Sequence, residues 1–189
     1  MTDYSILFKK REQQWFERIK PFLFDGNADI LKIGNGFGHL SEMIRGFSKS
    51  LKIYEIAVYE NTVNKSEVIL YDGKYLRLPE KSVDVTVFNL SFHHIPKNKE
   101  YLKNVVSLTK NRIIFVEETY DNLFQKAHLV WRDWYLNRKA GTPCRVFWRS
   151  YLKRSEVKDF FSDVGLEMIH RETFRHHSYY KELLVLDIV

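Results

Sequence analysis

The chain has few of the residues that lock or interrupt a fold: one cysteine, four prolines and eight glycines in 189 residues. Because Cys144 is the only cysteine, no disulfide can form within the chain, and we expect a reducing, cytoplasmic compartment. Long apolar runs are also missing, so we expect neither a transmembrane helix nor a signal peptide. Stability must come from a packed core, which residues 1–189 can build as one domain.

The chain has a small excess of positive charge. The net charge is +6, and the lysines and arginines are scattered rather than gathered in blocks. Such a balance can favour nucleic acid, but a solvated basic surface explains scattered charge better. We therefore expect a small-molecule partner rather than nucleic acid, with no membrane span, and the oligomeric state stays open.

The scarce glycines cluster after a short apolar run. Residues 30–33 are apolar except for Lys32, and Gly34, Gly36 and Gly38 follow at alternate positions. The segment 39–47 then carries apolar residues at helical spacing. The pattern predicts a strand, a glycine loop and a helix, a geometry in which backbone N–H groups can meet a polar ligand. The spacing differs from that of a dinucleotide loop, which argues against a nicotinamide cofactor. A glycine turn without a ligand is the alternative.

Strand and helix patterns alternate along the rest of the chain. Residues 1–27 form an N-terminal helical segment, a packing helix or a lid, that Pro21 should end or kink. Strands are predicted at 51–56, 66–71, 83–88 and 112–118, and helices at 98–109 and 149–161, the latter with Ser155 as a candidate N-cap. Two final strands, at 165–174 and 182–189, should pair antiparallel. The alternation predicts an α/β fold, with a mostly parallel sheet and helices on both faces.

Polar side chains follow several of these strands. The carboxyl ends of parallel strands meet at one edge of a sheet, and ligands bind beyond that edge. Glu55 ends the second strand, where a carboxylate can accept bonds from two ribose hydroxyls or can simply face solvent. Asp72 could accept a bond from the exocyclic amine of a base, or could only close an Asp-Gly turn with Gly73. Residues 89–94 follow the next strand.

Three motifs carry a family resemblance over residues 28–118. They are Leu31-Lys-Ile-Gly-Asn-Gly-Phe-Gly38, then Tyr71-Asp72-Gly73 followed by Leu78-Pro79, then Ser82-Val-Asp84-Val-Thr-Val with His93-His94-Ile. This stretch resembles the class I S-adenosylmethionine-dependent methyltransferases, and looks most like their small-molecule, ubiquinone-biosynthesis branch. The resemblance implies a Rossmann-like methyltransferase fold, with a mostly parallel seven-stranded sheet and an antiparallel last strand. It also implies S-adenosylmethionine as the cofactor.

By position, the resemblance implies a cofactor site with ten members: Lys32, Gly34, Asn35, Gly36, Gly38, Glu55, Ile56, Asp72, Gly73 and Asn89. The first glycines would cradle the methionine part and the ribose. Glu55 would hold the ribose hydroxyls, and Ile56 would pack on the adenine. Asp72 and Gly73 would meet the adenine amine, and Asn89 would lie under the methionine end.

Lys32 departs from the family pattern, which has an acid two places before the first glycine. A lysine there would repel the ammonium and sulfonium of the cofactor where screening is weak. Lys32 could turn away, could pair with the cofactor carboxylate or with an acid such as Glu117, or could mark a decayed site. We favour retained but weakened binding, from which Lys32→Asp should tighten cofactor binding.

The sequence gives less information about the residues that would contact the methyl acceptor. Residues 121–150 combine aromatic and basic side chains where the family places an insertion over the substrate, although a packed amphipathic helix is an equal alternative. His93 and His94 are candidate general bases or strand-end packing residues. We expect no metal site, because His176 and His177 have no clear third ligand.

The sequence therefore predicts an S-adenosylmethionine-dependent methyltransferase that acts on a small molecule. One alternative is a non-catalytic binding protein on a degenerate methyltransferase scaffold. Another is a nucleic-acid methyltransferase, which is disfavoured because Asn89 is followed by Leu-Ser-Phe rather than by Pro-Pro-Tyr. The acceptor and the atom methylated are not defined by the sequence.

Overall fold

The computed structural model describes residues 3–55, 62, 68–72, 74–139 and 145–189, with the backbone alone for residues 3–7. One mixed sheet has the strand order β3-β2-β1-β4-β5-β8-β7, and the short β6 pairs with the end of β5. The strands are β1 (Asp29–Ile33), β2 (Ser50–Glu55), β3 (Val68–Leu70), β4 (Val83–Asn89), β5 (Thr109–Tyr120), β6 (Leu152–Lys153), β7 (Leu166–His176) and β8 (Tyr179–Ile188). β8 runs antiparallel to both of its neighbours. The predicted α/β class, the mostly parallel sheet and the antiparallel final pair are confirmed, and the short β6 adds an eighth strand to the seven that were predicted.

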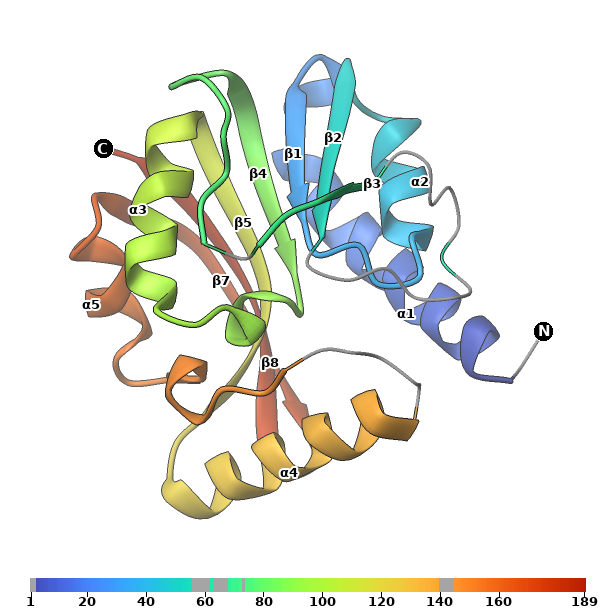
Figure 1. The fold of residues 1–189 in the computed structure, drawn as a ribbon, viewed down its shortest axis with the longest axis vertical. Coiled ribbons are helices and arrows are strands. Elements are labelled where there is room, and N and C mark those ends of the chain that lie inside the picture. The colour runs from blue at the N-terminus through green and yellow to red at the C-terminus, as the bar shows by residue number, and fades with distance from the viewer. Residues whose placement is uncertain (1–2, 56–61, 63–67, 73, 140–144) are drawn as a thin grey trace.

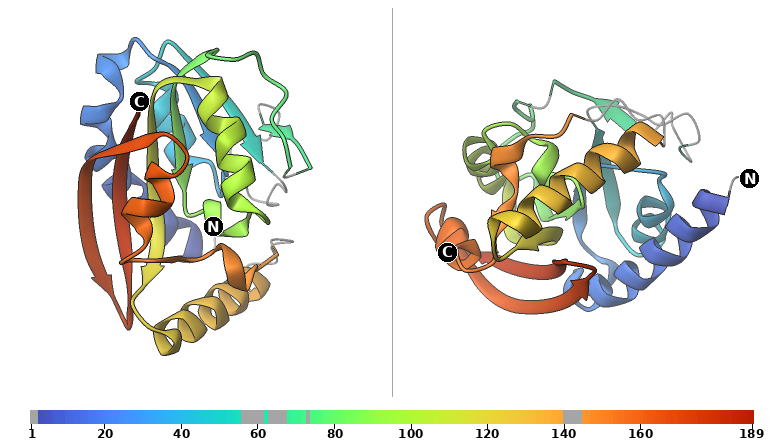
Figure 2. Two further views of the ribbon diagram at one scale, coloured as in Figure 1. Left: turned by 90° about the vertical axis from the view of Figure 1, so that its left-hand side faces the viewer. Right: turned by 90° about the horizontal axis from the view of Figure 1, so that it is seen from below.

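Helices cover both faces of this sheet (Figures 1 and 2). The helices are α1 (Asp3–Ile19), α2 (His39–Arg45), α3 (Asn98–Leu108), α4 (Leu123–Lys139) and α5 (Val157–Ser162). α1 and α2 pack on one face through a core that includes Trp15, Ile19 and Ile44. α3 and α5 pack on the other face through a core that includes Leu102 and Phe161. The central strands β1, β4 and β5 are thus buried on both sides, as their apolar sequences predict.

The side chains of β1 point alternately to these two faces of the sheet. Ile30 packs on the α1 and α2 side, whereas Leu31 and Ile33 pack on the α3 and α5 side. Because side chains alternate along a strand, Lys32 falls on the same side as Ile30, beneath α1 and α2. It is fully buried there.

The N-terminal helix ends as its sequence predicts. α1 stops at Ile19, and Pro21 lies in a single 3-10 turn, η1 (Lys20–Phe22), that leads towards β1. Proline fits the first turn of a helical segment but lacks the N–H that a continuing helix needs. None of the helices in the described ranges is both long and apolar enough to cross a bilayer.

The predicted helix over 149–161 is wrong in its first half. Leu152 and Lys153 form β6 and pair with Thr119 and Tyr120 at the end of β5. Residues 149–150 belong to a 3-10 turn, η5 (Trp148–Ser150), and the α-helix begins only at Val157. No side chain caps α5 by a hydrogen bond, so Ser155 is not its N-cap. Pairing with the unfilled edge at the end of β5 outweighs local helix propensity here.

α4 lies across the carboxyl edge of the sheet rather than on either face (Figure 1). It follows β5 directly, and its one fully buried apolar side chain, Leu129, packs with Tyr120, Tyr151 and Tyr179. A space bounded by α4 on one side and by the ends of the central strands on the other therefore contains the candidate site.

Candidate active site

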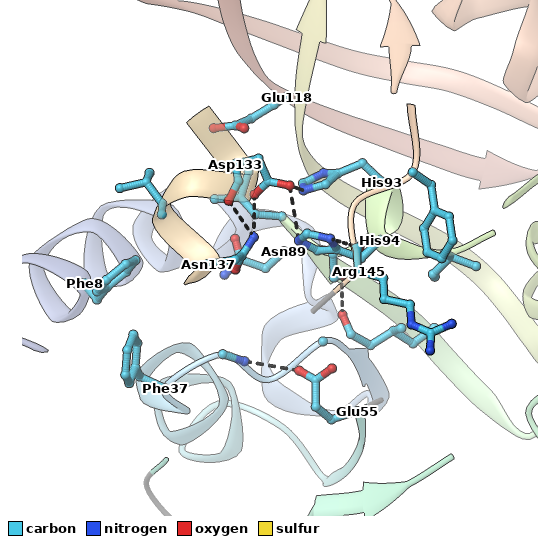
Figure 3. A pocket seen from close by; sticks show the side chains of 18 of the residues that line it. Phe8, Phe37, Glu55, Asn89, His93, His94, Glu118, Asp133, Asn137 and Arg145 are labelled. Atoms are coloured by element: carbon cyan, nitrogen blue, oxygen red, sulfur yellow. Dashed lines mark hydrogen bonds and ion pairs between the residues drawn. The ribbon is translucent and has the colours of Figure 1, made fainter. Parts of the chain in front are cut away.

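A pocket of about 550 Å³ opens at the carboxyl ends of β1, β2, β4 and β5. α1 and α4 supply its other walls, together with the segment that contains Arg145 and Phe147 (Figure 3). Volumes of roughly 300–1,000 Å³ are typical of small-molecule sites. Five of the predicted cofactor residues line the pocket, namely Gly34, Gly36, Glu55, Asp72 and Asn89.

The glycine loop is held tightly against the loop after β4. Gly34 has φ +82°, and a Cβ placed on it would lie 2.3 Å from the Cβ of Ser91. Asn35 is buried, and its side-chain oxygen accepts a hydrogen bond from the Ser41 hydroxyl. Gly38 precedes α2 with φ +88°. Neither Asn35 nor Gly38 is among the described residues that line the pocket, so they shape the loop from behind.

Glu55 ties the end of β2 to this loop. One of its carboxylate oxygens accepts hydrogen bonds from the backbone N–H groups of Asn35 and of Gly36, the latter at 3.4 Å. The side chain is nearly buried yet borders the pocket. A carboxylate is therefore fixed beside the glycine loop.

Asn89 ends β4 with an unused acceptor. Its side-chain oxygen is buried and finds no hydrogen-bond partner within the described part of the chain, although the residue lines the pocket. Buried polar atoms are normally paired, so an acceptor left open in a pocket indicates a ligand that donates. Asp72 lies at the exposed mouth, where its carboxylate accepts a bond from the backbone N–H of Lys74 at 2.9 Å. Ile56 and Gly73 lie outside the described residues.

Lys32 does not line the pocket. Its ammonium donates a hydrogen bond to the carbonyl of Gly34, beneath the loop. Burial lowers the pKa of Lys32, and the negative charges of Glu12 and Glu55 oppose that shift. Of the alternatives left open by the sequence, Lys32 turns away and has acids near it, but Glu117 is not its partner.

Glu12, on α1, is a site residue that the sequence analysis missed. It is 2% exposed and lines the pocket, and its carboxylate accepts a hydrogen bond from the backbone N–H of Leu40 at 2.8 Å. Its other oxygen lies 3.6 Å from the position of a Cβ on Gly36. Its burial was predictable, because Glu12 shares the helical spacing of Trp15 and Ile19 on the buried face of α1, but its position beside the glycine loop was not.

The His93 ring lies between two carboxylates, those of Glu117 and Asp133. It lies in a 3-10 turn, η4 (Phe92–His94), where its Nδ1 contacts the carboxylate of Glu117. Its Nε2 lies 3.7 Å from the carboxylate of Asp133. Burial lowers the pKa of His93, but the charge and hydrogen bond of Glu117, with the charge of Asp133, outweigh it and raise the pKa to about 9. His93 is therefore protonated at neutral pH and cannot accept a proton there.

His94 has the opposite state. Burial and the charge of His93 lower its pKa, so the ring is neutral at pH 7. Its Nδ1 lies 2.9 Å from the carbonyl oxygen of Arg145, and a carbonyl can only accept, so Nδ1 carries the proton. The Nε2 lone pair of His94 thus points towards Asp133, whose carboxylate is 3.8 Å away. Of the two predicted bases, only His94 has a lone pair at neutral pH.

The aromatic residues of segment 121–150 mostly face away from the pocket. Of the aromatic and histidine side chains that drew attention to this segment, only Phe147 lines it. Trp131, Trp134 and Tyr135 are exposed on the outer face of α4. The inner face contributes four residues instead: Arg132, Asp133, Leu136 and Asn137. Composition indicated the covering segment, but not which of its side chains meet the ligand.

A glycine loop after β1, a carboxylate at the end of β2 and a pocket at the carboxyl edge of the sheet are features of Rossmann-like nucleotide-binding folds. The family described as methyltransferase domain matches residues 7–171, and the chain belongs to that family. Family and fold together identify it as an S-adenosylmethionine-dependent methyltransferase. No curated protein sequence matches the chain.

Solved structures share this fold at low sequence identity. A geranyl diphosphate C-methyltransferase from Streptomyces coelicolor A3(2), solved with Mg²⁺, geranyl diphosphate and S-adenosyl-L-homocysteine, has a TM-score of 0.68 at 12% identity, covering 94% of this chain and 79% of that chain. The magnesium protoporphyrin IX methyltransferase of Synechocystis PCC 6803, with bound SAH, has a TM-score of 0.61 at 14% identity, covering 96% and 84%. A methyltransferase candidate from Bacillus halodurans C-125 has a TM-score of 0.67 at 11% identity, covering 91% and 97%.

Proposed function

We propose that the protein binds S-adenosylmethionine against its glycine loop and transfers the methyl group to a small-molecule acceptor held beneath α4. The observation that carries this proposal is the continuity of the pocket. One cavity of about 550 Å³ runs from Gly34, Gly36 and Glu55 to His94 and Asp133. The cofactor end and the acceptor end thus share one space, as a direct transfer requires.

The residues at the glycine-loop end fit the cofactor chemically. Glu55 offers a carboxylate for the ribose hydroxyls, and the open oxygen of Asn89 offers an acceptor for the methionine ammonium. Glu12 adds a second carboxylate beside Gly36. Two acids and one amide oxygen suit a ligand with an ammonium and a sulfonium. Asp72, at the mouth, is the proposed partner of the adenine amine.

Bound S-adenosylmethionine supplies an electrophilic methyl group. The chain's own contribution is to hold the acceptor in line with that group and to keep water away, which α4 and Phe147 do by covering the pocket. If the acceptor must lose a proton, the Nε2 lone pair of His94 is the available base at neutral pH.

The far end of the pocket supports a small and anionic acceptor. Arg132 and Arg145 line it, and both come from the segment that covers the strand ends. Cationic side chains in a covered pocket favour a carboxylate or phosphate on the acceptor. Assignment to the ubiquinone-biosynthesis branch stays a prediction. A screen for release of S-adenosylhomocysteine with anionic and neutral small acceptors tests this proposal, and methylation of RNA or DNA alone would overturn it.

Replacement of Glu55 by glutamine should weaken binding of S-adenosylhomocysteine by roughly 10–100-fold. A hydrogen bond to a charged group contributes about 1.5–3 kcal/mol, and glutamine cannot accept two diol bonds with the strength of a carboxylate. Calorimetric titration measures the change. Glu167→Gln, an exposed acid on β7, is the matched control and should bind like the unmodified protein. Equal affinities for the two variants would remove Glu55 from the site.

A further inference from the structure

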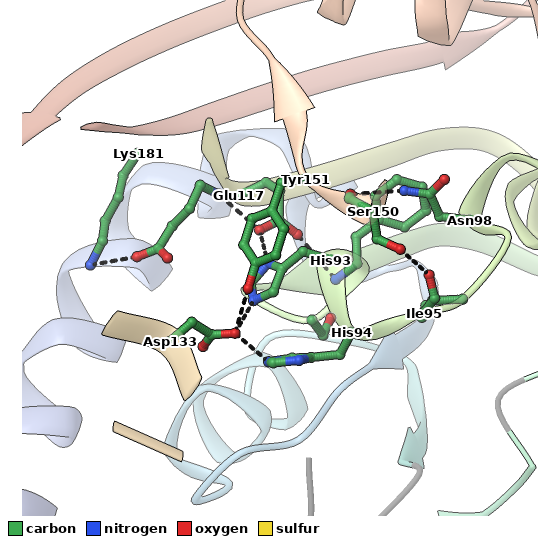
Figure 4. A network of polar contacts seen from close by, with 12 residues as sticks. His93, His94, Ile95, Asn98, Glu117, Asp133, Ser150, Tyr151 and Lys181 are labelled. Atoms are coloured by element: carbon green, nitrogen blue, oxygen red, sulfur yellow. Dashed lines mark hydrogen bonds and ion pairs between the residues drawn. The ribbon is translucent and has the colours of Figure 1, made fainter. Parts of the chain in front are cut away.

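Three potential ligand atoms converge at the end of the pocket opposite the glycine loop (Figures 3 and 4). They are ring nitrogens of His93 and His94 and a carboxylate oxygen of Asp133, all within 4.8 Å of one another. Nε2 of His93 lies 3.7 Å from the Asp133 oxygen, and Nε2 of His94 lies 3.8 Å from it. Two elements far apart in sequence, η4 and α4, therefore bring two imidazoles and one carboxylate to a common point.

The other ring nitrogen of each histidine is held by an acceptor. Nδ1 of His93 contacts the Glu117 carboxylate, and Nδ1 of His94 lies 2.9 Å from the Arg145 carbonyl. A histidine that binds a metal through Nε2 almost always donates its Nδ1–H to a carboxylate or a carbonyl, which fixes the ring and raises its basicity. Both histidines of this cluster have that arrangement. Binding of a metal through Nε2 of His93 would release to solvent the proton that this ring carries at neutral pH, so metal affinity should rise with pH.

The carboxylate is oriented as firmly as the rings. One oxygen of Asp133 accepts a hydrogen bond from the Tyr151 hydroxyl at 2.6 Å, and the other accepts one from the Asn137 amide at 2.8 Å. Tyr151 also stacks on the His93 ring, with centroids 4.9 Å apart. All three side chains are thus fixed before any ligand enters.

We propose that His93, His94 and Asp133 bind one divalent transition-metal ion of the Zn²⁺ type. Imidazole and carboxylate ligands favour Zn²⁺ and its neighbours in the first transition row over Mg²⁺. Tetrahedral metal–ligand bonds of about 2.0–2.2 Å place ligand atoms roughly 3.3–3.6 Å apart. The two histidine nitrogens are within a few tenths of an ångström of that separation from the Asp133 oxygen. The two ring nitrogens lie within 4.8 Å of each other and would turn towards a common point by up to about 1.5 Å on binding. Three protein ligands leave a fourth coordination position, and the pocket lies beside it.

This site also has a consequence for the acceptor, which rests on the proposed methyltransferase function. An oxygen of the acceptor in the fourth position would have its proton acidified by the metal. His94 would then act as a metal ligand, and its lone pair would not serve as a free base. The acceptor class would narrow to molecules with an ionisable hydroxyl or a carboxylate.

Metal titration of the purified protein after treatment with a chelator tests the site. Addition of Co²⁺ should produce visible absorption bands that saturate at one ion per chain, and Zn²⁺ should displace Co²⁺. Mg²⁺ should bind much more weakly. His94→Gln and Asp133→Asn should each weaken Co²⁺ binding at least tenfold. His177→Gln, at an exposed histidine next to His176, is the matched control and should leave binding unchanged.

Thermal melting and binding of S-adenosylhomocysteine show whether each variant is folded. Saturable Co²⁺ binding that survives both cluster substitutions, or no saturable binding by the folded protein, would overturn the metal site. In that case the cluster serves only as a buried hydrogen-bond network. Metal binding without any binding of S-adenosylhomocysteine would leave the site standing and would contradict the proposed function instead.

Discussion

Lys32→Asp is expected to weaken cofactor binding and to destabilise the fold. The Lys32 ammonium is fully buried, bonds to the Gly34 carbonyl and lies in the field of Glu12 and Glu55. An aspartate would add a third carboxylate to this enclosed group and would release the loop carbonyl. Removing one partner from a buried charge cluster costs about 3–5 kcal/mol. For a chain of this size, that corresponds to a decrease in melting temperature of roughly 10 °C.

Thermal melting and titration with S-adenosylhomocysteine measure the two effects separately. The double variant Lys32→Met, Glu12→Gln removes one charge of each sign and is the matched control. It should melt closer to the unmodified protein than Lys32→Asp does, because apolar replacements of buried ion pairs are often tolerated. Tighter cofactor binding by Lys32→Asp would contradict the charge arrangement described here.

The sign of this prediction is opposite to the one that the sequence alone favours. Read along β1, Lys32 replaces a family acid and should repel the cofactor. In the structure, strand alternation directs Lys32 away from the pocket, and Glu12 of α1 brings a carboxylate to the glycine loop from another element. Such a compensation depends on how α1 packs on α2, which local sequence patterns do not encode.

Gly34→Ala should be the most damaging of the small substitutions. An added Cβ would lie 2.3 Å from the Cβ of Ser91, and φ at this position is +82°. The left-handed conformation costs a non-glycine residue roughly 1–2 kcal/mol, and overpacking typically adds 1–3 kcal/mol. We expect a loss of about 3 kcal/mol in the free energy of unfolding and no measurable binding of S-adenosylhomocysteine.

Gly165→Ala provides a matched control for the backbone contribution. Gly165 has φ +81°, close to that of Gly34, but a Cβ there would meet no atom within 4 Å. Denaturant unfolding of both variants therefore separates the conformational cost from the contact with Ser91. Adding Ser91→Gly to Gly34→Ala should recover part of the loss. Equal destabilisation by Gly34→Ala and Gly165→Ala would show that close packing of the loop is unimportant.

The local elements of the fold were predictable because each carries its own pattern. The apolar run before Gly34 predicts β1, and the helical spacing from 39 to 47 predicts α2. The position of Glu55 at the end of a predicted parallel strand likewise predicted that it would lie at the carboxyl edge of the sheet, where the pocket is. Where a segment pairs with a distant partner, as residues 152–153 do with the end of β5, propensity gave the wrong element.

The acceptor side of the site was less predictable. Asp133 carries no signal of its own in a segment dominated by aromatic and basic residues, and only the path of α4 across the strand ends brings it to His93 and His94. We expected no metal site because we looked for one only around His176 and His177, which are adjacent in sequence. The proposed third ligand belongs to a helix that follows β5, so no spacing rule could have found it.

Calorimetric titration of the purified protein with S-adenosylmethionine and with S-adenosylhomocysteine tests the proposed cofactor site most directly. The arrangement of Glu12, Glu55 and Asn89 around the glycine loop predicts one binding site per chain with micromolar affinity, weakened by Glu55→Gln. A folded protein that binds neither molecule would contradict it, and would identify the chain as a methyltransferase scaffold that has lost its cofactor site.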